Sequence, residues 1–470
     1  MPSTSSEQGS GAQFATLTAI TVVTGVVSSL GAPLVPTIAA EQGIPLATAQ
    51  WVLTAALLSG AVVTPVLGRL GTGALRRPVL LGGLGVVLAG TVLSALPLGV
   101  GPMIAGRALQ GVGMALAPLA FAAARDLWSG EELLARLSLL SVATVSGAGL
   151  GYPASSFVAE HAGIAGAYAF GAALVATATV LALRHLPAAA DGTPQPVDGA
   201  GAVLLCTGTL GFLLAVSQGD RWGWTHPATV LAGAGGVLLV AAWVWWSLLR
   251  DRRGRPTLVD LRLARRPGIL APHAVTVAVS ISLYGLFTLV VVLVQADGSA
   301  GYGLDAGLAA SGLALVPYAV AGIAANRLAL ALAQRGAARL LLPSGCIVFG
   351  GSLLMLAAWH ETLAQAFAAM AVGGLGGGLT FSSMAMLIVP RVSADETAGA
   401  MAFNQLLRYL GFSVGSALTV ALLDVFGADG TALRATALTM AGVCLTAGAL
   451  AALGRPTDRG DSPAPASAAR

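Results

Sequence analysis

Fourteen long apolar segments dominate this sequence, and they restrict it to folds that form in a lipid bilayer. Each segment has roughly the twenty residues that an α-helix needs to cross the hydrocarbon core. The segments are continuous, whereas the strands of a membrane β-barrel are short and alternate in polarity. We therefore predict an all-α polytopic membrane protein with fourteen transmembrane helices. The helices are expected at residues 14–39, 47–69, 78–99, 102–124, 137–159, 164–184, 199–218, 227–249, 269–295, 307–333, 340–359, 363–389, 398–424 and 432–453.

The scarcity of charge agrees with this prediction. Only 9% of the residues are charged, against about 25% in a typical soluble protein. So few charges could not cover soluble domains of this size without exposing large apolar patches. The net charge of +4 arises from arginines in loops, so we expect the lipid bilayer as a partner and no nucleic acid.

The positions of the arginines predict the orientation in the membrane. Cytoplasmic loops carry an excess of basic residues. If the N-terminus is cytoplasmic, 19 of the 24 arginines fall on that side and only Arg221 and Arg434 lie in outer loops. A missed span would invert every later loop and remove this asymmetry. We therefore expect a multi-pass protein of the cell inner (plasma) membrane with both termini in the cytoplasm.

Three arginines stand inside apolar segments, where a charge costs a few kcal/mol at the membrane centre, and two of them have polar neighbours on the same helix. Arg107 shares a helix face with Gln110, one turn away, and lies in the outer half of its segment. It either has a role in gating or proton coupling or extends its guanidinium to the outer surface. Arg408 lies near mid-membrane, close to Asn404 and Gln405. These amides and nearby carbonyls either satisfy it, or it contacts a substrate.

Two glycine-containing stretches predict close contacts between helices. Gly147 and Gly151 form a G-x-x-x-G face in the fifth segment, and Pro153 predicts a kink there. The second stretch is the short inner loop after the second segment. It runs from Gly68 to residues 76–77, a pair of arginines that by themselves are ordinary positive-inside charges.

Taken together, these patterns resemble the major facilitator superfamily, and more narrowly its branch of fourteen-span drug:proton antiporters. Residues 107–115 are similar to the family's R-x-x-Q-G-x-G-x-A motif, and residues 408–415 to the branch's pattern of arginine and two glycines. The fifth segment resembles the antiporter motif, except that Tyr152 precedes the proline. The inner loop resembles the family's loop motif through Gly68, Arg76 and Arg77, with Thr72 in place of the family's aspartate.

The resemblance implies two six-helix bundles with an extra helix pair inserted between them, working as a monomer. The loop at 250–268 contains seven arginines. It is either an amphipathic segment on anionic lipid or a solvated linker that enforces topology, and we favour the linker. The expected units are a cytoplasmic N-terminal tail at 1–13, bundles at 14–185 and 269–453, the helix pair at 198–249, the basic cytoplasmic loop at 250–268 and a disordered cytoplasmic tail at 454–470.

A proton antiporter needs a group that cycles its protonation, normally a carboxylate inside the membrane. Many members of the branch have an aspartate in span 1, but this chain has Val27 at that position and no acid deep in any segment. Glu160 and Glu41 lie at outer helix ends and could approach Arg107. We expect gating and proton coupling to involve Arg107, Gln110, Glu160 and Glu41, although simple solvation of the two acids is the other interpretation.

The resemblance implies a secondary transporter that exports hydrophobic small molecules, such as antibiotics or secondary metabolites, in exchange for protons. Because arginine is the charge inside the membrane, we expect neutral or anionic substrates bound near Arg408, Asn404 and Gln405. The alternative is an importer or facilitator on the same fold without proton antiport. The sequence shows neither the polar rings of a channel nor the clustered histidines or acids of an enzyme site. Cys206, Cys346 and Cys444 are widely spaced, so we expect no metal and no cofactor.

Overall fold

The computed structural model describes residues 3–31, 34–187, 196–296, 303–306, 308–427 and 430–453. Within these ranges the chain is almost entirely helical and contains no strand. The tail expected to be disordered, at 454–470, lies outside the described residues.

The first bundle consists of long helices whose apolar length matches a bilayer crossing. The fourth crossing is made of α6 and α7 joined by a short 3₁₀ stretch at Val112–Ala115, where the glycines lower helix propensity. The helices are α1 (Ser3–Ser29), α4 (Trp51–Leu70), α5 (Arg76–Ala95), α6 (Val100–Gly111), α7 (Leu116–Leu127) and α8 (Gly130–His185).

Helix α8 is one continuous element of 56 residues but makes two crossings. Gly163 has a φ of 70° and interrupts the helical backbone there. This left-handed conformation is one that glycine adopts readily. The described residues contain 13 helices long and apolar enough to span a membrane. Because α8 doubles back at Gly163, they make fourteen crossings, as predicted.

The inserted pair follows, and its second helix leads into the arginine-rich loop. The pair is α9 (Gly199–Trp222) and α10 (Pro227–Arg252). A short helix, α11 (Leu261–Arg265), forms inside the loop, and the Asp260 carboxylate caps it by accepting from two backbone amides. The loop is therefore partly structured, and Leu258 and Val259 are buried against the transmembrane helices.

The second bundle repeats the pattern of long apolar helices. Its helices are α12 (Pro267–Gln295), α13 (Leu308–Leu313), α14 (Leu315–Gln334), α15 (Leu341–Ala358), α16 (Leu363–Ile388), α17 (Ala394–Phe426) and α18 (Gly430–Leu453). Among the described residues, the other short elements between crossings are α2 (Val35–Glu41), α3 (Leu46–Ala49), η1 (Gly73–Leu75), η4 (Ala338–Leu340) and η5 (Val389–Arg391).

Two expected boundaries differ from the structure. Residues 3–13, expected as a polar tail, already belong to α1; polarity places a segment in water but does not prevent it from forming a helix. The first crossing, expected at 14–39, ends at Ser29, and α2 is a separate helix. The break follows from Gly31, whose φ of 90° cannot continue a right-handed helix.

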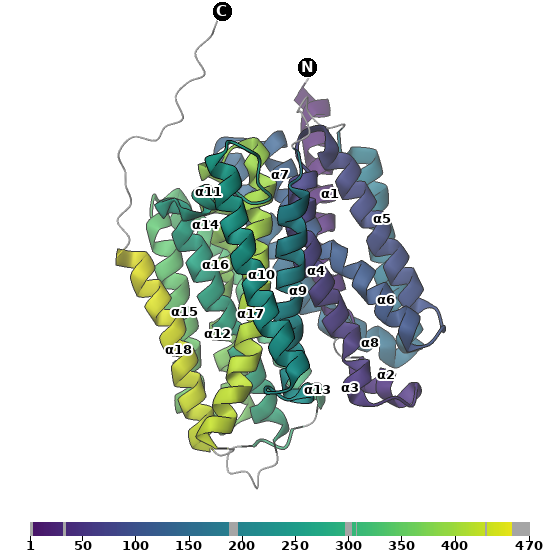
Figure 1. Ribbon diagram of the computed structural model, residues 1–470, viewed down its shortest axis with the longest axis vertical. Coiled ribbons are helices and arrows are strands. Elements are labelled where there is room, and N and C mark those ends of the chain that lie inside the picture. The colour runs from purple at the N-terminus through teal and green to yellow at the C-terminus, as the bar shows by residue number, and fades with distance from the viewer. Residues whose placement is uncertain are drawn as a thin grey trace, which may run out of the picture.

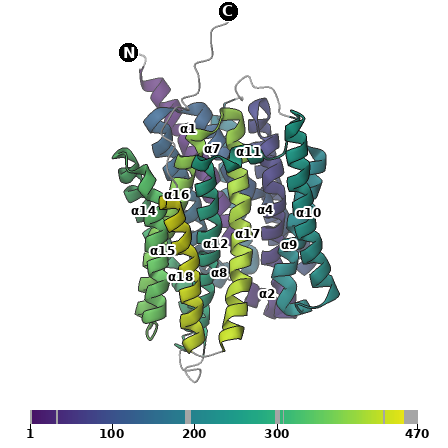
Figure 2. The ribbon, with the colours of Figure 1, turned by 60° about the vertical axis from the view of Figure 1, so that its left-hand side comes forward.

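The two bundles stand side by side with their helices roughly along one axis (Figure 1). The inserted pair α9 and α10 packs against α4 at the edge of the molecule (Figure 2). The first residues of α1 and the last of α18 point to the same end of the molecule (Figure 1). We call this end the inner end and the opposite end the outer end.

Candidate functional site

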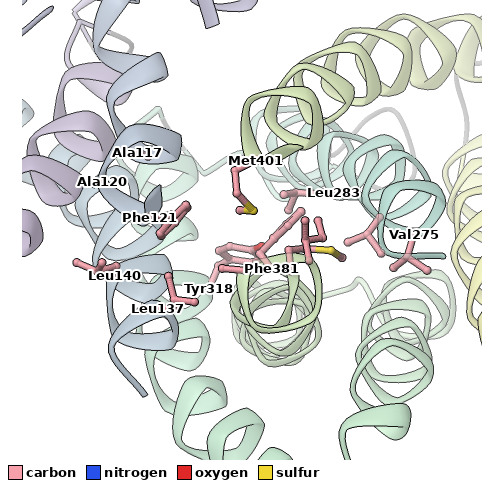
Figure 3. Close-up of a cluster of buried hydrophobic side chains, with 14 of the residues drawn as sticks. Ala117, Ala120, Phe121, Leu137, Leu140, Val275, Leu283, Tyr318, Phe381 and Met401 are labelled. Carbon is pink, nitrogen blue, oxygen red and sulfur yellow. The ribbon is translucent and has the colours of Figure 1, made fainter. Parts of the chain in front are cut away.

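Apolar side chains fill the centre of the interface between the two bundles. Figure 3 shows Phe121 and Leu137 of the first bundle across from Tyr318, Phe381 and Met401 of the second. All are buried or nearly so. These side chains come from α7, α8, α14, α16 and α17, so the interface brings together segments that are distant in the sequence.

A small cavity of about 20 Å³, partly open to solvent, lies within this interface. Both bundles contribute to its walls. The lining residues are Ala117, Pro118, Phe121, Ser141 and Thr144 from the first bundle, and Phe381, Met384, Met401, Gln405 and Arg408 from the second. The mixture of apolar walls and a few polar groups is typical of sites that bind small organic molecules.

Arg408 is the charged residue of this cavity. Its guanidinium carbon lies 4.2 Å from the ring centre of Phe381, a cation–π contact. Its Nε is buried and has no hydrogen-bond partner, and Arg408 forms no ion pair with any described residue. Gln405 instead donates to the hydroxyl of Tyr409 at 2.9 Å. The cavity therefore offers a cation whose charge no protein group neutralises.

Asn404 does not line this cavity. It faces α12, where its Nδ2 lies 3.1 Å from Nδ1 of His273 and 2.8 Å from the hydroxyl oxygen of Thr276. Of the three residues expected at the substrate site, the structure thus brings Gln405 and Arg408 together and places Asn404 in a separate network.

Arg107 lies in the outer half of the first bundle and is completely buried. Its Nε donates to the carbonyl of Val52 at 2.9 Å, and its Nη1 donates to the carbonyl of Val27 at 3.0 Å and to Oε1 of Gln110 at 2.6 Å. Complete burial excludes the alternative in which this side chain extends to the outer surface.

Gln110 continues the network to α5. Its Nε2 donates to the Ser94 hydroxyl at 3.0 Å and to the Gly90 carbonyl at 3.3 Å. Arg107 and Gln110 therefore join α6 to α1, α4 and α5. The sequence predicted the shared face of these two residues, but it gave no indication that their partners are backbone carbonyls.

The carbonyl of Val27 takes the place of the acid that the family resemblance led us to look for. Val27 lies in the last turn of α1, where carbonyls lack helical donors and carry the negative end of the helix dipole. A guanidinium placed there gains both a hydrogen bond and a favourable field. The buried charge of Arg107 is thus stabilised without a carboxylate.

The two acids expected near Arg107 do not reach it. Glu160 lies near the outer end of the first leg of α8, and Glu41 is the last residue of α2; both are exposed. Neither has a hydrogen bond or ion pair with a described residue. The structure therefore brings together Arg107 and Gln110 but leaves Glu160 and Glu41 apart from them.

The glycines of the fifth crossing pack against α1 with almost no space. A Cβ at Gly147 would lie 2.4 Å from the carbonyl oxygen of Val22, and one at Gly151 would lie 2.9 Å from the Cα of Val26. Pro153 follows within the same leg of α8 and is partly buried. The G-x-x-x-G face thus sets the distance between α8 and α1.

At the inner end, the loop residues form a second set of contacts. A Cβ at Gly68 would lie 2.5 Å from the Cβ of Ala402 in α17. Arg76 pairs with Asp126 at the end of α7, and Arg77 donates to the carbonyl of Leu183 at 3.1 Å. The two arginines therefore do more than fix topology, since they tie three helix ends together.

Residues that no sequence pattern identified bridge the two bundles near the inner end. Arg125 of α7 donates to the carbonyl of Val389 and, at 3.2 Å, to the hydroxyl of Thr397. Ser138 of α8 donates to the side-chain oxygen of Asn326 in α14. In the sequence Arg125 was one inner-loop charge among many, because partners more than 250 positions away leave no local pattern.

Comparison with known proteins agrees with this architecture. The sequence profile of the Major Facilitator Superfamily matches residues 17–214 and 276–470. A probable actinorhodin transporter of Streptomyces coelicolor is 27% identical over 448 residues, 93% of this chain and 75% of the relative. The cephamycin export protein of Amycolatopsis lactamdurans is 27% identical over 409 residues, 83% of this chain and 80% of the relative.

Among solved structures, a human organic anion transporter superposes with a TM-score of 0.63 at 15% sequence identity, covering 94% of this chain and 98% of its own. At this identity the likeness concerns the fold alone. The stretch between the two profile matches, 215–275, includes α10 and α11. The profile match over most of the sequence and the shared fold show that this chain is a multi-pass transporter, and not an enzyme, that belongs to the Major Facilitator Superfamily.

Proposed function

We propose that this protein exports hydrophobic, neutral or anionic small molecules across the plasma membrane in exchange for protons. The observation that carries the proposal is Arg408, a cation without a counter-ion in a cavity between the two bundles. A neutral ligand oxygen or an anion would complete its contacts, whereas a cationic ligand would be repelled in this low-dielectric site.

Alternating access about this cavity follows from how the bundles meet. Near the inner end they are joined by Arg125 with Val389 and Thr397, and by the close approach of Gly68 to α17. The cavity residues lie farther from that end, from about one helical turn (Phe121 and Met401) to about three turns (Arg408) beyond these contacts. Breaking the inner contacts would expose Arg408 to the inner side, which is the state that takes up a substrate for export.

The relatives support the direction of transport. Two of them are named for an antibiotic or antibiotic-like compound, as a probable actinorhodin transporter and a cephamycin export protein. We infer that this chain likewise exports such a compound, acts as a monomer and keeps both termini in the cytoplasm. The glycine face of α8, which the resemblance connects with export, packs as that motif requires.

Transport into inside-out membrane vesicles tests the proposal. Actinorhodin and a cephamycin serve as probes, and ethidium serves as a cationic comparison. We expect an imposed proton gradient to drive uptake of at least one of the first two, to drive ethidium less, and to dissipate during uptake.

Three results would contradict this proposal. Accumulation with no opposing proton movement would exclude antiport. Movement only in the opposite direction, or only down the probe's own gradient, would support the importer or facilitator alternative. A preference for ethidium that Arg408→Gln leaves unchanged would exclude Arg408 as the basis of selectivity.

A further inference from the structure

His273 is a buried ionisable side chain of α12 for which the proposed transport cycle provides no role. Only 4% of its surface is exposed. Its ring packs edge-on against Phe403 of α17, with ring centres 5.3 Å apart. Histidine is the side chain whose charge ordinarily changes between about pH 5 and 8, and this one lies within a membrane crossing.

An amide holds the imidazole in its neutral form. Because Nδ2 of Asn404 donates to Nδ1 of His273 at 3.1 Å, that ring nitrogen is the acceptor and the ring proton is on Nε2. The same Nδ2 donates to the Thr276 hydroxyl at 2.8 Å. The other amide atom, Oδ1 of Asn404, is buried and has no hydrogen-bond partner.

This unused oxygen is the acceptor that a protonated ring needs. When Nδ1 carries a hydrogen it can no longer accept, so the Asn404 amide must turn over. Oδ1 then accepts from the Nδ1–H of His273 and from the Thr276 hydroxyl. The side chains already in place thus provide a hydrogen-bonded arrangement for each of the two protonation states.

His273 also lines a small pocket of about 30 Å³ at the inner end, and this pocket is partly open to solvent. The pocket lies between α4, the loop before α12, and α17. Its charged residues are Arg69 from α4, Asp260 from the loop, and Asp395 and Glu396 from α17. Arg391, from the segment after α16, lies against Gly268 near the start of α12. Three carboxylates and two guanidiniums therefore lie around the path from the imidazole ring to the inner side. A proton that leaves the ring can pass to one of these carboxylates.

We propose that His273 is the proton-binding residue of the transport cycle and that Asn404 positions its ring. This inference rests on the proposed antiport function. The imidazole takes one proton from water in the outward-open protein and returns one proton to water at the inner end, and no other bond forms or breaks. A ring that is only 4% exposed disfavours an imidazolium, so protonation favours the state in which the inner end opens to water.

Asn404 provides a path from this residue to the substrate cavity. It lies one helical turn before Arg408 on α17. A turn of the Asn404 amide, or a shift of α17 that accommodates it, therefore moves the helix that carries the cavity's cation. Proton binding and substrate binding are coupled through one rigid element rather than through direct contact.

The test measures the inner end directly and needs no transported compound. Spin labels are placed at Ser129, just before α8, and at Gln334, the last residue of α14. Both positions are neutral and exposed and lie at the inner end of different bundles. The full chain, with its three cysteines replaced by alanine, is studied in nanodiscs by double electron–electron resonance between pH 5 and 8. We expect the population of longer distances to grow as the pH falls.

The variants separate a proton site from a structural role. His273→Gln should fold and lose the pH response. His360→Gln is the matched control, because His360 is also buried, 5% exposed, but lies at the outer end after α15; it should respond like the parent. Asn404→Leu keeps the ring but removes its partner, so the midpoint should move by roughly one pH unit or more.

Two outcomes overturn the inference: a parent protein whose distances do not change with pH, or a His273→Gln protein that responds like the parent. Size-exclusion chromatography identifies a variant that has not folded. If His273→Gln does not fold, the shift of the pH midpoint in Asn404→Leu decides whether His273 binds the proton. Because no substrate is used, failure to find an exported compound would count against the proposed function and leave this result standing.

Discussion

Arg107 and Arg408 are both arginines inside the membrane, yet their surroundings differ in nearly every respect. Arg107 is fully enclosed, and it donates to two backbone carbonyls and to Gln110. Arg408 lies in a cavity between the bundles, over the face of Phe381, with its Nε unpaired. Its own bundle holds Arg107 through Nε and Nη1, although Nη2 has no hydrogen-bond partner, whereas Arg408 has no hydrogen bond with any described residue.

The difference teaches that a buried charge indicates a function only when its partners are known. Both arginines impose a cost on the membrane-embedded chain. For Arg107 the protein recovers that cost in contacts that hold α1, α4, α5 and α6 together. For Arg408 it does not, and such an unneutralised charge is expected to persist where a ligand completes it.

The largest effect is expected from Arg107→Ala. Loss of the guanidinium leaves the Val27 carbonyl and Oε1 of Gln110 buried without a donor, at a cost of roughly 1–3 kcal/mol each. We expect a clear fall in the melting temperature of the detergent-solubilised protein and no transport. Arg107→Lys should also be harmful, since an ammonium lacks the planar fork that reaches carbonyls of two helices. Parent-like stability in Arg107→Ala would remove the distinction between the two arginines.

Arg408→Gln should have the opposite effect, in that stability is kept and ligand binding is weakened. It removes a charge whose Nε has no partner, so melting should be unchanged or slightly improved. Affinity for an anionic probe should fall by about tenfold or more, because a hydrogen bond to a charged group contributes roughly 1.5–3 kcal/mol. Probe binding and melting are measured on the same purified protein. Loss of stability together with unchanged affinity would show that Arg408 is a structural residue like Arg107.

How far the sequence predicts this molecule depends on whether a feature is local. The number of crossings follows from the number and length of the apolar segments, so the fourteen crossings were predictable. The double crossing of α8 was predictable from two apolar runs, and in the structure these are two helical legs that meet at the non-helical Gly163. The end of α1 at Ser29 is also marked in the sequence, by Gly31, Pro33 and Pro36, but the prediction from apolar length ran across these residues because the apolar run continues beyond them.

The site shows the same division. The shared face of Arg107 and Gln110 is a matter of spacing on one helix, and the sequence predicted it. The partners of Arg107 are carbonyls, which every residue has, so no side-chain pattern could identify them. Arg125 and His273 were overlooked because their partners come from other helices, Thr397 and Asn404. Contacts between distant helices are invisible in one sequence.

Gly147→Ala sharpens the comparison by disturbing the position of α1, whose terminal carbonyl holds Arg107. The added methyl would lie 2.4 Å from the carbonyl oxygen of Val22, so α1 must shift. Overpacking of this kind typically costs about 1–3 kcal/mol. Gly85→Ala is the matched control, because a Cβ there would meet no atom within 4 Å. We expect a lower melting temperature and slower transport for Gly147→Ala alone; equal behaviour of the two variants would show that the glycine face is not tightly constrained.

The smallest effect is expected from Glu160→Gln and Glu41→Gln, separately and together. Both side chains are exposed and make no contact with Arg107, and surface changes of this kind usually alter stability by less than about 0.5 kcal/mol. If the end of α1 holds Arg107 and no acid does, an outer carboxylate contributes nothing to the transport rate. Transport and its proton coupling should then stay within about twofold of the parent in reconstituted vesicles. Loss of coupling in the double variant, with substrate exchange retained, would place the proton on an outer acid. Arg107 would then belong to a switch that forms its acid contact in another conformation, and the contrast with Arg408 would apply only to the closed inner state described here.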